Sequence, residues 1–184
     1  MDSITSIDNP PALNQKSRMA SIKLDDRDIK ILATLSREGR ISKSDLAKRV
    51  NLSPTPCWER LSRLEKAGVI SGYHADIELK HVGPQVSVFV MIELENHRSA
   101  TFQAFEQAIA GYDEIMSCWA LGGGFDYLLH VITRDIDSYQ RLIDDLLARR
   151  AGLARYFTYI VTKPVKHSTV PPFDILTAAG PETI

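Results

Sequence analysis

Residues 51–70 read "NLSPTPCWERLSRLEKAGVI", and this stretch decides the fold of the N-terminal half. From Leu61 onward it has the pattern of an amphipathic helix, yet Pro54 and Pro56 come just before, and proline normally interrupts helices. The conflict disappears if Ser53 is the N-cap, because Pro54 is then the first helical residue and Pro56 the third. Amide groups in a first turn have no acceptor inside the helix, so the prolines remove donors that the helix does not need. The sequence therefore predicts a helix that begins at Pro54 with a stiffened first turn.

A first helix is predicted between Asp25 and Gly39, within "LDDRDIKILATLSREG". Asp25 is a suitable N-cap, and Asp28 stands three residues further on, as in a capping box. Gly39 is expected to end this helix in the left-handed conformation. The side chains expected to be buried are Ile29, Leu32, Ala33 and Leu35.

A second helix of about two turns is predicted over residues 43–50, with Ser42 as its N-cap. Asn51 tolerates the left-handed conformation that a tight turn needs. In the helix that follows, Cys57, Leu61 and Leu64 share the side that faces the core. A short helix, a tight turn and a capped helix form the pattern of a helix-turn-helix.

The outer side of the third helix is polar and basic. From residue 37 to residue 66 there are eight basic and four acidic side chains, a net of +4, whereas the whole chain carries −1. This asymmetry favours contact with a polyanion, with Arg63 on a guanine or a phosphate. An ordinary three-helix bundle with a solvated face remains the alternative, in which Trp58 packs at the flank and Glu59 pairs with Arg63. The predicted DNA contacts are Ser42, Lys43, Ser53, Thr55, Trp58, Glu59, Arg60, Ser62, Arg63 and Lys66.

From residue 85 the periodicity changes to strands that alternate with helices. The order strand, helix, strand, strand, helix, strand predicts a ferredoxin-like domain of the α+β class. Both helices should cover one face of the sheet, and an uncovered apolar face favours a homodimer. The side chains expected on the uncovered face are Phe89, Met91, Tyr127, Leu129 and Tyr159. Strands are predicted near residues 86–94, 114–121, 125–133 and 154–163, and helices at 99–110 and 135–149.

The turn "LGGGFDY" has more glycines than a tight hairpin needs. Three glycines expose amide groups and permit close approach of another backbone or a small ligand, whose ammonium group Asp126 could face. The alternative is a plain hairpin in which the side chain of Asp126 bonds its own turn.

Taken together, residues 24–166 resemble the Lrp/AsnC family of transcription regulators. The resemblance rests on "LDDRDIKIL", "SPTPCWERLSRLEKAGVISGY", "GGFDYLLHV" and "TYIV". It implies a winged-type helix-turn-helix joined by a strand to a ferredoxin-like domain that binds small effectors, often amino acids. It also implies dimers that assemble into tetramers, octamers or larger rings, with effectors bound between dimers. Gly124 stands where well-known members carry a polar or acidic residue, so their ligand preference does not transfer. The effector residues implied by the resemblance are Trp119, Gly122, Gly123, Gly124, Phe125 and Asp126.

The domain organisation expected from these features has five parts. They are a tail at residues 1–21, the helix-turn-helix at 22–69, a linker strand at 70–84, the ferredoxin-like domain at 85–167 and a tail at 168–184, and we assign neither tail a function. No apolar run is long enough for a membrane span, no secretory signal is visible, and the two cysteines are expected to be reduced, which favours the cytoplasm.

The function predicted from the sequence is an effector-modulated, DNA-binding transcription regulator. No catalytic residues, metal site or cofactor are expected, because the five histidines are scattered without the spacing of zinc ligands. An architectural DNA-binding protein without an effector, or an enzyme on a ferredoxin-like fold, are the alternatives.

Overall fold

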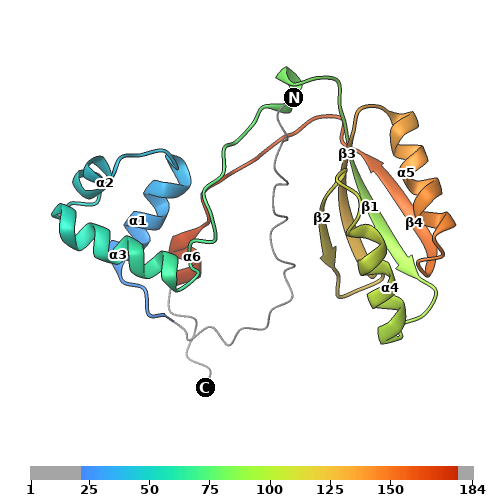
Figure 1. Cartoon of the computed structure of the whole chain (residues 1–184), viewed down its shortest axis with the longest axis horizontal. Coiled ribbons are helices and arrows are strands. Elements are labelled where there is room, and N and C mark those ends of the chain that lie inside the picture. The colour runs from blue at the N-terminus through green and yellow to red at the C-terminus, as the bar shows by residue number, and fades with distance from the viewer. Residues whose placement is uncertain (1–21, 178–184) are drawn as a thin grey trace, which may run out of the picture. The chain divides into compact units, whose positions relative to one another are not determined.

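The computed structural model describes residues 22–177. The chain divides into two compact units, each with its own core (Figure 1). Among the described residues, the helical unit comprises 22–75 together with 168–177, and the sheet unit comprises 76–167. Within the described residues, no helix is long and apolar enough to cross a membrane.

The helical unit contains α1 (Asp26–Arg37), α2 (Lys43–Arg49), α3 (Pro54–Lys66) and the short α6 (Phe173–Thr177). The predicted caps of α1 and α2 are confirmed. Asp25 and Asp28 form a complete capping box, and the Ser42 hydroxyl accepts a hydrogen bond from the Asp45 amide at 3.1 Å. These local signals fix where the first two helices begin.

The helix α3 begins at Pro54, as predicted, and the Cys57 amide donates to the Ser53 carbonyl at 3.2 Å. Ser53 has N-cap geometry, but its side chain makes no capping bond. An N-cap hydroxyl accepts from the second or third helical amide, and the third residue here is Pro56, which has no N–H. The prolines therefore stiffen the first turn and also remove one of the donors that would have bonded the cap.

Two details of the first helix differ from expectation. Gly39 does not have a positive φ, although it directly follows Glu38, the C-cap of α1. The most deeply buried apolar side chain of α1 is Ile31, which was not among those expected in the core. Asn51 has a φ of 55°, so the left-handed turn before α3 is confirmed.

The core of the helical unit joins all three main helices. The inward side predicted for α3 is confirmed, because Cys57, Leu61 and Leu64 are buried. The buried cluster consists of Ile31, Leu32, Leu46, Ala47, Val50, Cys57, Leu61 and Leu64. This packing leaves the opposite side of α3 at the surface.

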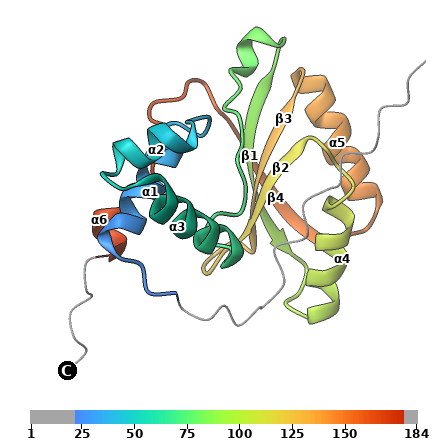
Figure 2. The ribbon, with the colours of Figure 1, turned by 60° about the vertical axis from the view of Figure 1, so that its left-hand side comes forward.

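The sheet unit has the predicted ferredoxin-like architecture. Its four antiparallel strands lie in the order β2-β3-β1-β4. Both long helices lie on one side of the sheet (Figure 2), and the side chains of that face form the core. The elements are β1 (Val86–Leu94), α4 (Ser99–Ile109), β2 (Ile115–Ala120), β3 (Tyr127–Thr133), α5 (Ile136–Ala148) and β4 (Leu153–Ile160).

The face expected for two β3 side chains was wrong. Tyr127 and Leu129 are buried under the helices, and Leu128, His130 and Ile132 alternate with them on the other face. Both faces of β3 are largely apolar, so alternation alone does not say which residues point inward. The open face instead carries Phe89, Met91, Trp119, Leu128, His130, Ile132, Phe157 and Tyr159, following the register of the three strand pairs.

The strand predicted for the linker at residues 70–84 is not formed within this single chain. Within the described residues this segment pairs with no strand, and its one regular element is a 3₁₀ turn at Leu79–His81. A strand requires a neighbouring backbone to accept and donate its hydrogen bonds, and a side-chain pattern cannot supply one. The segment predicted as a C-terminal tail contains the helix α6, whereas the tail predicted at residues 1–21 lies outside the described residues.

Candidate nucleic-acid interface and effector site

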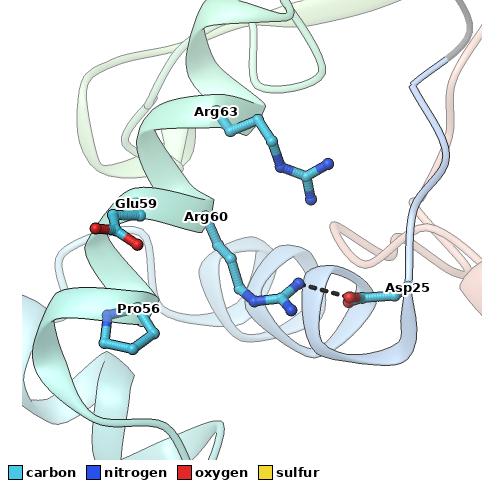
Figure 3. A pocket seen from close by; sticks show the side chains of 5 residues that line it. All are labelled: Asp25, Pro56, Glu59, Arg60 and Arg63. Atoms are coloured by element: carbon cyan, nitrogen blue, oxygen red, sulfur yellow. Dashed lines mark hydrogen bonds and ion pairs between the residues drawn. The ribbon is translucent and has the colours of Figure 1, made fainter.

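The outer side of α3 is a polar surface. Thr55, Glu59, Arg63 and Lys66 are exposed, and Ser62 is half-buried. Because the leucines of the same helix are buried, the helix presents this side outward. A shallow depression on the surface is lined by Asp25, Pro56, Glu59, Arg60 and Arg63 (Figure 3).

Two arginines of α3 bind one buried carboxylate of α1. The side chain of Asp28 is 1% exposed and accepts hydrogen bonds from Arg60 Nη1 at 2.9 Å and Arg63 Nη2 at 2.6 Å. Its Oδ2 also accepts from the Asp25 amide at 3.0 Å. Arg60 Nη1 contacts Asp25 Oδ2 at 2.7 Å as well (Figure 3). This Asp28 cluster, formed by Asp25, Asp28, Arg60 and Arg63, fastens α3 to the start of α1.

Charge balance keeps both aspartates ionised. Burial acts to raise the pKa of Asp28, but hydrogen bonds from Arg63, the Asp25 amide and Arg60 outweigh it, so this pKa is lowered. The Asp28 amide and the Arg60 guanidinium lower the pKa of Asp25 to about 2. The arginines therefore compensate a charge that would be costly to bury alone.

The sequence analysis placed Asp28 only in a capping box, where it does lie. Its second role was missed, although a signal was present. Asp28 stands three and four residues before the buried Ile31 and Leu32, which places it on the inward side of the helix. An acidic residue on a buried stripe requires a cationic partner, and α3 provides two.

The Glu59–Arg63 pair expected within α3 does not form among the described residues. Arg63 bonds Asp28 instead, and its side chain remains 43% exposed. A guanidinium has five N–H donors, so one bond through Nη2 leaves others for a phosphate or a base. The bond to Asp28 thus orients the Arg63 side chain and leaves N–H donors of its guanidinium free to bind DNA.

Trp58 and Lys43 lie against each other at the flank of α3. The Lys43 Nζ atom is 3.3 Å from the centre of the Trp58 ring, which is a cation–π contact. Trp58 is 42% exposed. The pair links α2 to α3 and places a cation beside the polar surface.

The glycine turn is open on its outer side. A Cβ atom built on Gly122, Gly123 or Gly124 would meet nothing within 4 Å, and none of the three has a left-handed φ. The fold of this chain therefore does not require glycine at these positions. Space for another molecule remains a physical reason for their small size.

The side chain of Asp126 does not bond its own turn. Its Oδ2 accepts from the Leu94 amide at 2.8 Å, and its Oδ1 lies 3.0 Å from His97 Nε2. Asp126 thus holds the glycine turn against the end of β1. His97 was not predicted at this place, because it is distant in sequence.

The other two predicted effector residues lie at the rim of the open sheet face. Trp119 is opposite Leu128 in the strand register and is exposed. Phe125 makes an edge contact with Phe157 at 5.3 Å between ring centres. The structure therefore brings Phe125 to β4, whereas Asp126 contacts the end of β1.

His130 is a packed residue of the open face rather than a member of a site. Its ring stacks on Phe89 with 4.8 Å between centres, and Nε2 lies 2.9 Å from Ser87 Oγ. Burial lowers the pKa of His130. Both cysteines are free thiols, with Cys57 in the helical core and burial raising the pKa of Cys118 to about 11.

The two units define a class of protein: a helix-turn-helix DNA-binding unit on the same chain as a ferredoxin-like ligand domain. Residues 24–71 match the winged helix-turn-helix DNA-binding family, and residues 87–171 match the Lrp/AsnC ligand binding domain. The chain belongs to the Lrp/AsnC family of transcription regulators.

Curated relatives support this membership along most of the chain. The transcriptional regulatory protein DoeX of Halomonas elongata is 52% identical over 145 residues, which are 79% of this chain and 92% of that protein. The leucine-responsive regulatory protein of Escherichia coli K12 is 41% identical over 145 residues, 79% of this chain and 88% of its own length.

Solved structures agree with the fold. A transcriptional regulator of Neisseria meningitidis in complex with L-Met has a TM-score of 0.78 and 32% identity, and the match covers 84% of this chain and 99% of that one. An AsnC family regulator of Agrobacterium tumefaciens has a TM-score of 0.77 and 30% identity, with coverage of 83% and 99%. This chain is a DNA-binding transcription regulator with a ligand-binding domain.

Proposed function

We propose that α3 is the recognition helix and that its outer side enters the major groove of operator DNA. The observation that carries this proposal is the exposed polar side of α3, held in a fixed orientation by Asp28 while its leucines are buried. Thr55, Glu59 and Ser62 reach base edges, and Arg60, Arg63 and Lys66 bind phosphates or guanine. The sugar–phosphate backbone of the DNA on either side of the groove is contacted by Ser42, Lys43, Ser53 and Trp58.

We further propose that the effector is an amino acid or a close derivative, bound at Gly122–Asp126 with Trp119 nearby. The free space outside the glycines supports this site. So do the L-Met in the Neisseria structure and the name of the leucine-responsive regulatory proteins among the relatives. An ammonium group of the ligand would share the Asp126 carboxylate with His97, or replace His97 there.

The assembled form in this proposal is a homodimer, built through the open sheet face, that assembles further into tetramers, octamers or larger rings. Exposed aromatic and aliphatic side chains on that face favour burial against a second copy. Effector binding changes operator occupancy because the ligand binds two assembly states unequally. The protein acts in the cytoplasm and has no catalytic role, in keeping with relatives named as regulators.

DNA binding is tested through its salt dependence. Duplexes enriched from a random pool by the wild-type protein provide the probe, and fluorescence anisotropy gives affinity at several salt concentrations. Lys66→Ala should reduce the slope of log K against log salt by about 0.9, the value for one phosphate contact. Lys80→Ala is the matched control, because Lys80 is an exposed lysine of the sheet unit paired with Glu78 at 3.1 Å. An unchanged slope in Lys66→Ala, together with unchanged sequence preference in Thr55→Val, would remove α3 from the interface.

Effector binding is tested by thermal shift with the twenty common amino acids, starting with L-Met and L-Leu. A ligand at a hundred times its Kd stabilises the folded state by about 2.7 kcal/mol. Gly123→Ala should leave the unliganded melting temperature unchanged and abolish the ligand-induced shift. Gly111→Ala is the control, because a Cβ there also meets nothing within 4 Å but lies in another turn. Equal shifts in the two variants would exclude the glycine turn as the binding site.

A further inference from the structure

The C-terminal segment beyond the sheet unit packs on the helical unit. Residues 168–177 group with α1, α2 and α3, and not with the sheet from which they emerge. Phe173 packs against the buried core of the helical unit, and the Thr169 hydroxyl donates to the Ser36 carbonyl of α1 at 3.3 Å. Both views of the ribbon place α6 beside α1 (Figures 1 and 2). The chain therefore passes between the two units twice.

The helix α6 has an inner and an outer side of different character. Phe173 is half-buried, whereas Ile175 is 76% and Leu176 is 69% exposed. Five residues are far fewer than the roughly twelve that an isolated helix needs in water. Pro171 and Pro172 restrict the chain just before it, and the amides of Ile175 and Leu176 donate to the Pro172 carbonyl. Packing of Phe173 on the core is thus the tertiary contact that stabilises this short helix.

The docked helix α6 lies just beyond the residues that match the Lrp/AsnC ligand binding domain. The ligand-domain match ends at residue 171, and α6 begins at Phe173. The matched ligand domain therefore does not include Phe173, which packs against the core of the helical unit. An apolar side chain with this position calls for a role of its own.

We propose that residues 168–177 form a C-terminal strap, which docks Phe173 on the α1 side of the helical unit of the same chain and tethers that unit to the sheet unit by a second connection. The first connection, from Ile70 to Val86, can extend to about 54 Å at roughly 3.4 Å per residue, because Val69 and Ile70 still pack on the helical core. The second connection, from Ile160 to Thr169, can extend only to about 30 Å. Docking therefore nearly halves the largest separation that the chain permits and raises the effective concentration of one unit near the other.

The strap has a consequence for regulation, and this part rests on the proposed function. An effector-driven change in the sheet unit reaches the DNA-binding surface better when the shorter second connection is docked than through the long first connection alone. Among the described residues, the strap contacts Ser36 and the helical core, and none of the predicted DNA contacts. Undocking it should leave the DNA-binding surface itself intact.

Hydrogen exchange on the full-length protein tests the docking without DNA or effector. Phe173→Ala should accelerate exchange in residues 168–177 and at the C-terminal end of α1 by about tenfold, as local opening becomes easier. Ile175→Ala is the matched control on the exposed side of α6 and should exchange like the wild type. Phe173→Leu, which keeps an apolar side chain, should restore most of the protection. Equal exchange in Phe173→Ala and Ile175→Ala would overturn the strap.

Docking within one chain is separated from docking onto a second copy by dilution. Protection of residues 168–177 that persists across a hundredfold dilution, while the oligomer dissociates, supports the strap. Protection that disappears with the oligomer means that Phe173 binds a neighbouring chain, and the single-chain strap is then wrong.

The regulatory consequence is measured as the ratio of DNA affinities with and without L-Met or L-Leu, whichever stabilises the wild type. Phe173→Ala should keep the affinity of the unliganded protein and reduce this ratio several-fold, and Ile175→Ala should keep both. An unchanged ratio in Phe173→Ala would overturn the coupling role. If the wild type shows no DNA binding or no ligand shift, the proposed function fails, while the exchange experiment still decides whether the strap docks.

Discussion

The two units of this chain stabilise their architecture in different ways. The sheet unit has an extended apolar core between one sheet face and two helices, and Thr133 is its one buried polar residue among those described. The helical unit has a smaller buried cluster and a fully buried aspartate bound by two arginines. A small helical domain buries little apolar surface, so directional ionic contacts add orientation that packing alone does not specify. The surface helix α3 is thus oriented by ionic contacts in addition to its buried leucines, whereas the ligand domain is held by packing.

The largest loss of stability is expected from a substitution in the core of the sheet unit. Leu129→Ala should lower the free energy of unfolding by about 3 kcal/mol, because Leu129 is fully buried under the helices. Leu128→Ala is the control on the open face and should weaken dimerisation more than folding. Chemical denaturation and sedimentation of both variants measure this. If Leu128→Ala were the more destabilising to the fold, the strand register would be incorrect.

The second-largest loss of stability is expected from a substitution in the helical unit. Asp28→Asn should cost about 2 kcal/mol, because the amide keeps the shape of the carboxylate but loses its charge-assisted bonds to Arg60 and Arg63. The neighbouring Asp26 is exposed, so Asp26→Asn should be nearly neutral. Thermal unfolding followed by Trp58 fluorescence, in a Trp119→Phe background that removes the tryptophan of the sheet unit, reports on this unit. Similar melting curves for the two variants would mean that packing alone positions α3.

A smaller effect distinguishes two glycines of the sheet unit. Gly152 has a φ of 77°, and a Cβ there would lie 2.6 Å from Thr101 Cγ2, so Gly152→Ala should cost on the order of 1 kcal/mol or more. Gly123→Ala should leave stability within about 0.5 kcal/mol of the wild type, as for a surface substitution. Denaturant midpoints of the two variants check this contrast. A large loss in Gly123→Ala would show that the turn is constrained from within the chain.

The smallest effect is the response of the two units to pH. The lowered pKa of His130 means that its contribution to the sheet unit is present above pH 6.5 and is lost as the pH falls through the folded-state pKa. The pKa of Asp25, lowered from 3.8 to about 2, means that its contribution to the helical unit is lost only between these values. Melting temperatures at successive pH values should therefore fall first in the sheet unit. His130→Gln should remove that early fall, and its persistence in this variant would assign it to another group.

Local signals predicted the beginnings of the helices well. Asp25, Ser42 and Ser53 mark N-caps, and Pro54 and Pro56 fit the first turn of α3, because these preferences depend on a few adjacent residues. The order of strands and helices also predicted the ferredoxin-like fold, since connection rules leave few topologies. The end of α1 and the phase of β3 were less predictable, because Gly39 and the two apolar faces of β3 permit more than one arrangement.

The helix starts, the strand order and the polar outer side of α3 follow from the amino-acid sequence, because each depends on periodicity or on neighbours in the chain. The folded chain was needed to reveal that Arg60 and Arg63 share the carboxylate of Asp28, that Asp126 bonds the end of β1, and that Phe173 packs on the helical core. Each of these contacts joins residues more than thirty positions apart. Their energies depend on burial and on bond geometry, which exist only after the chain has folded.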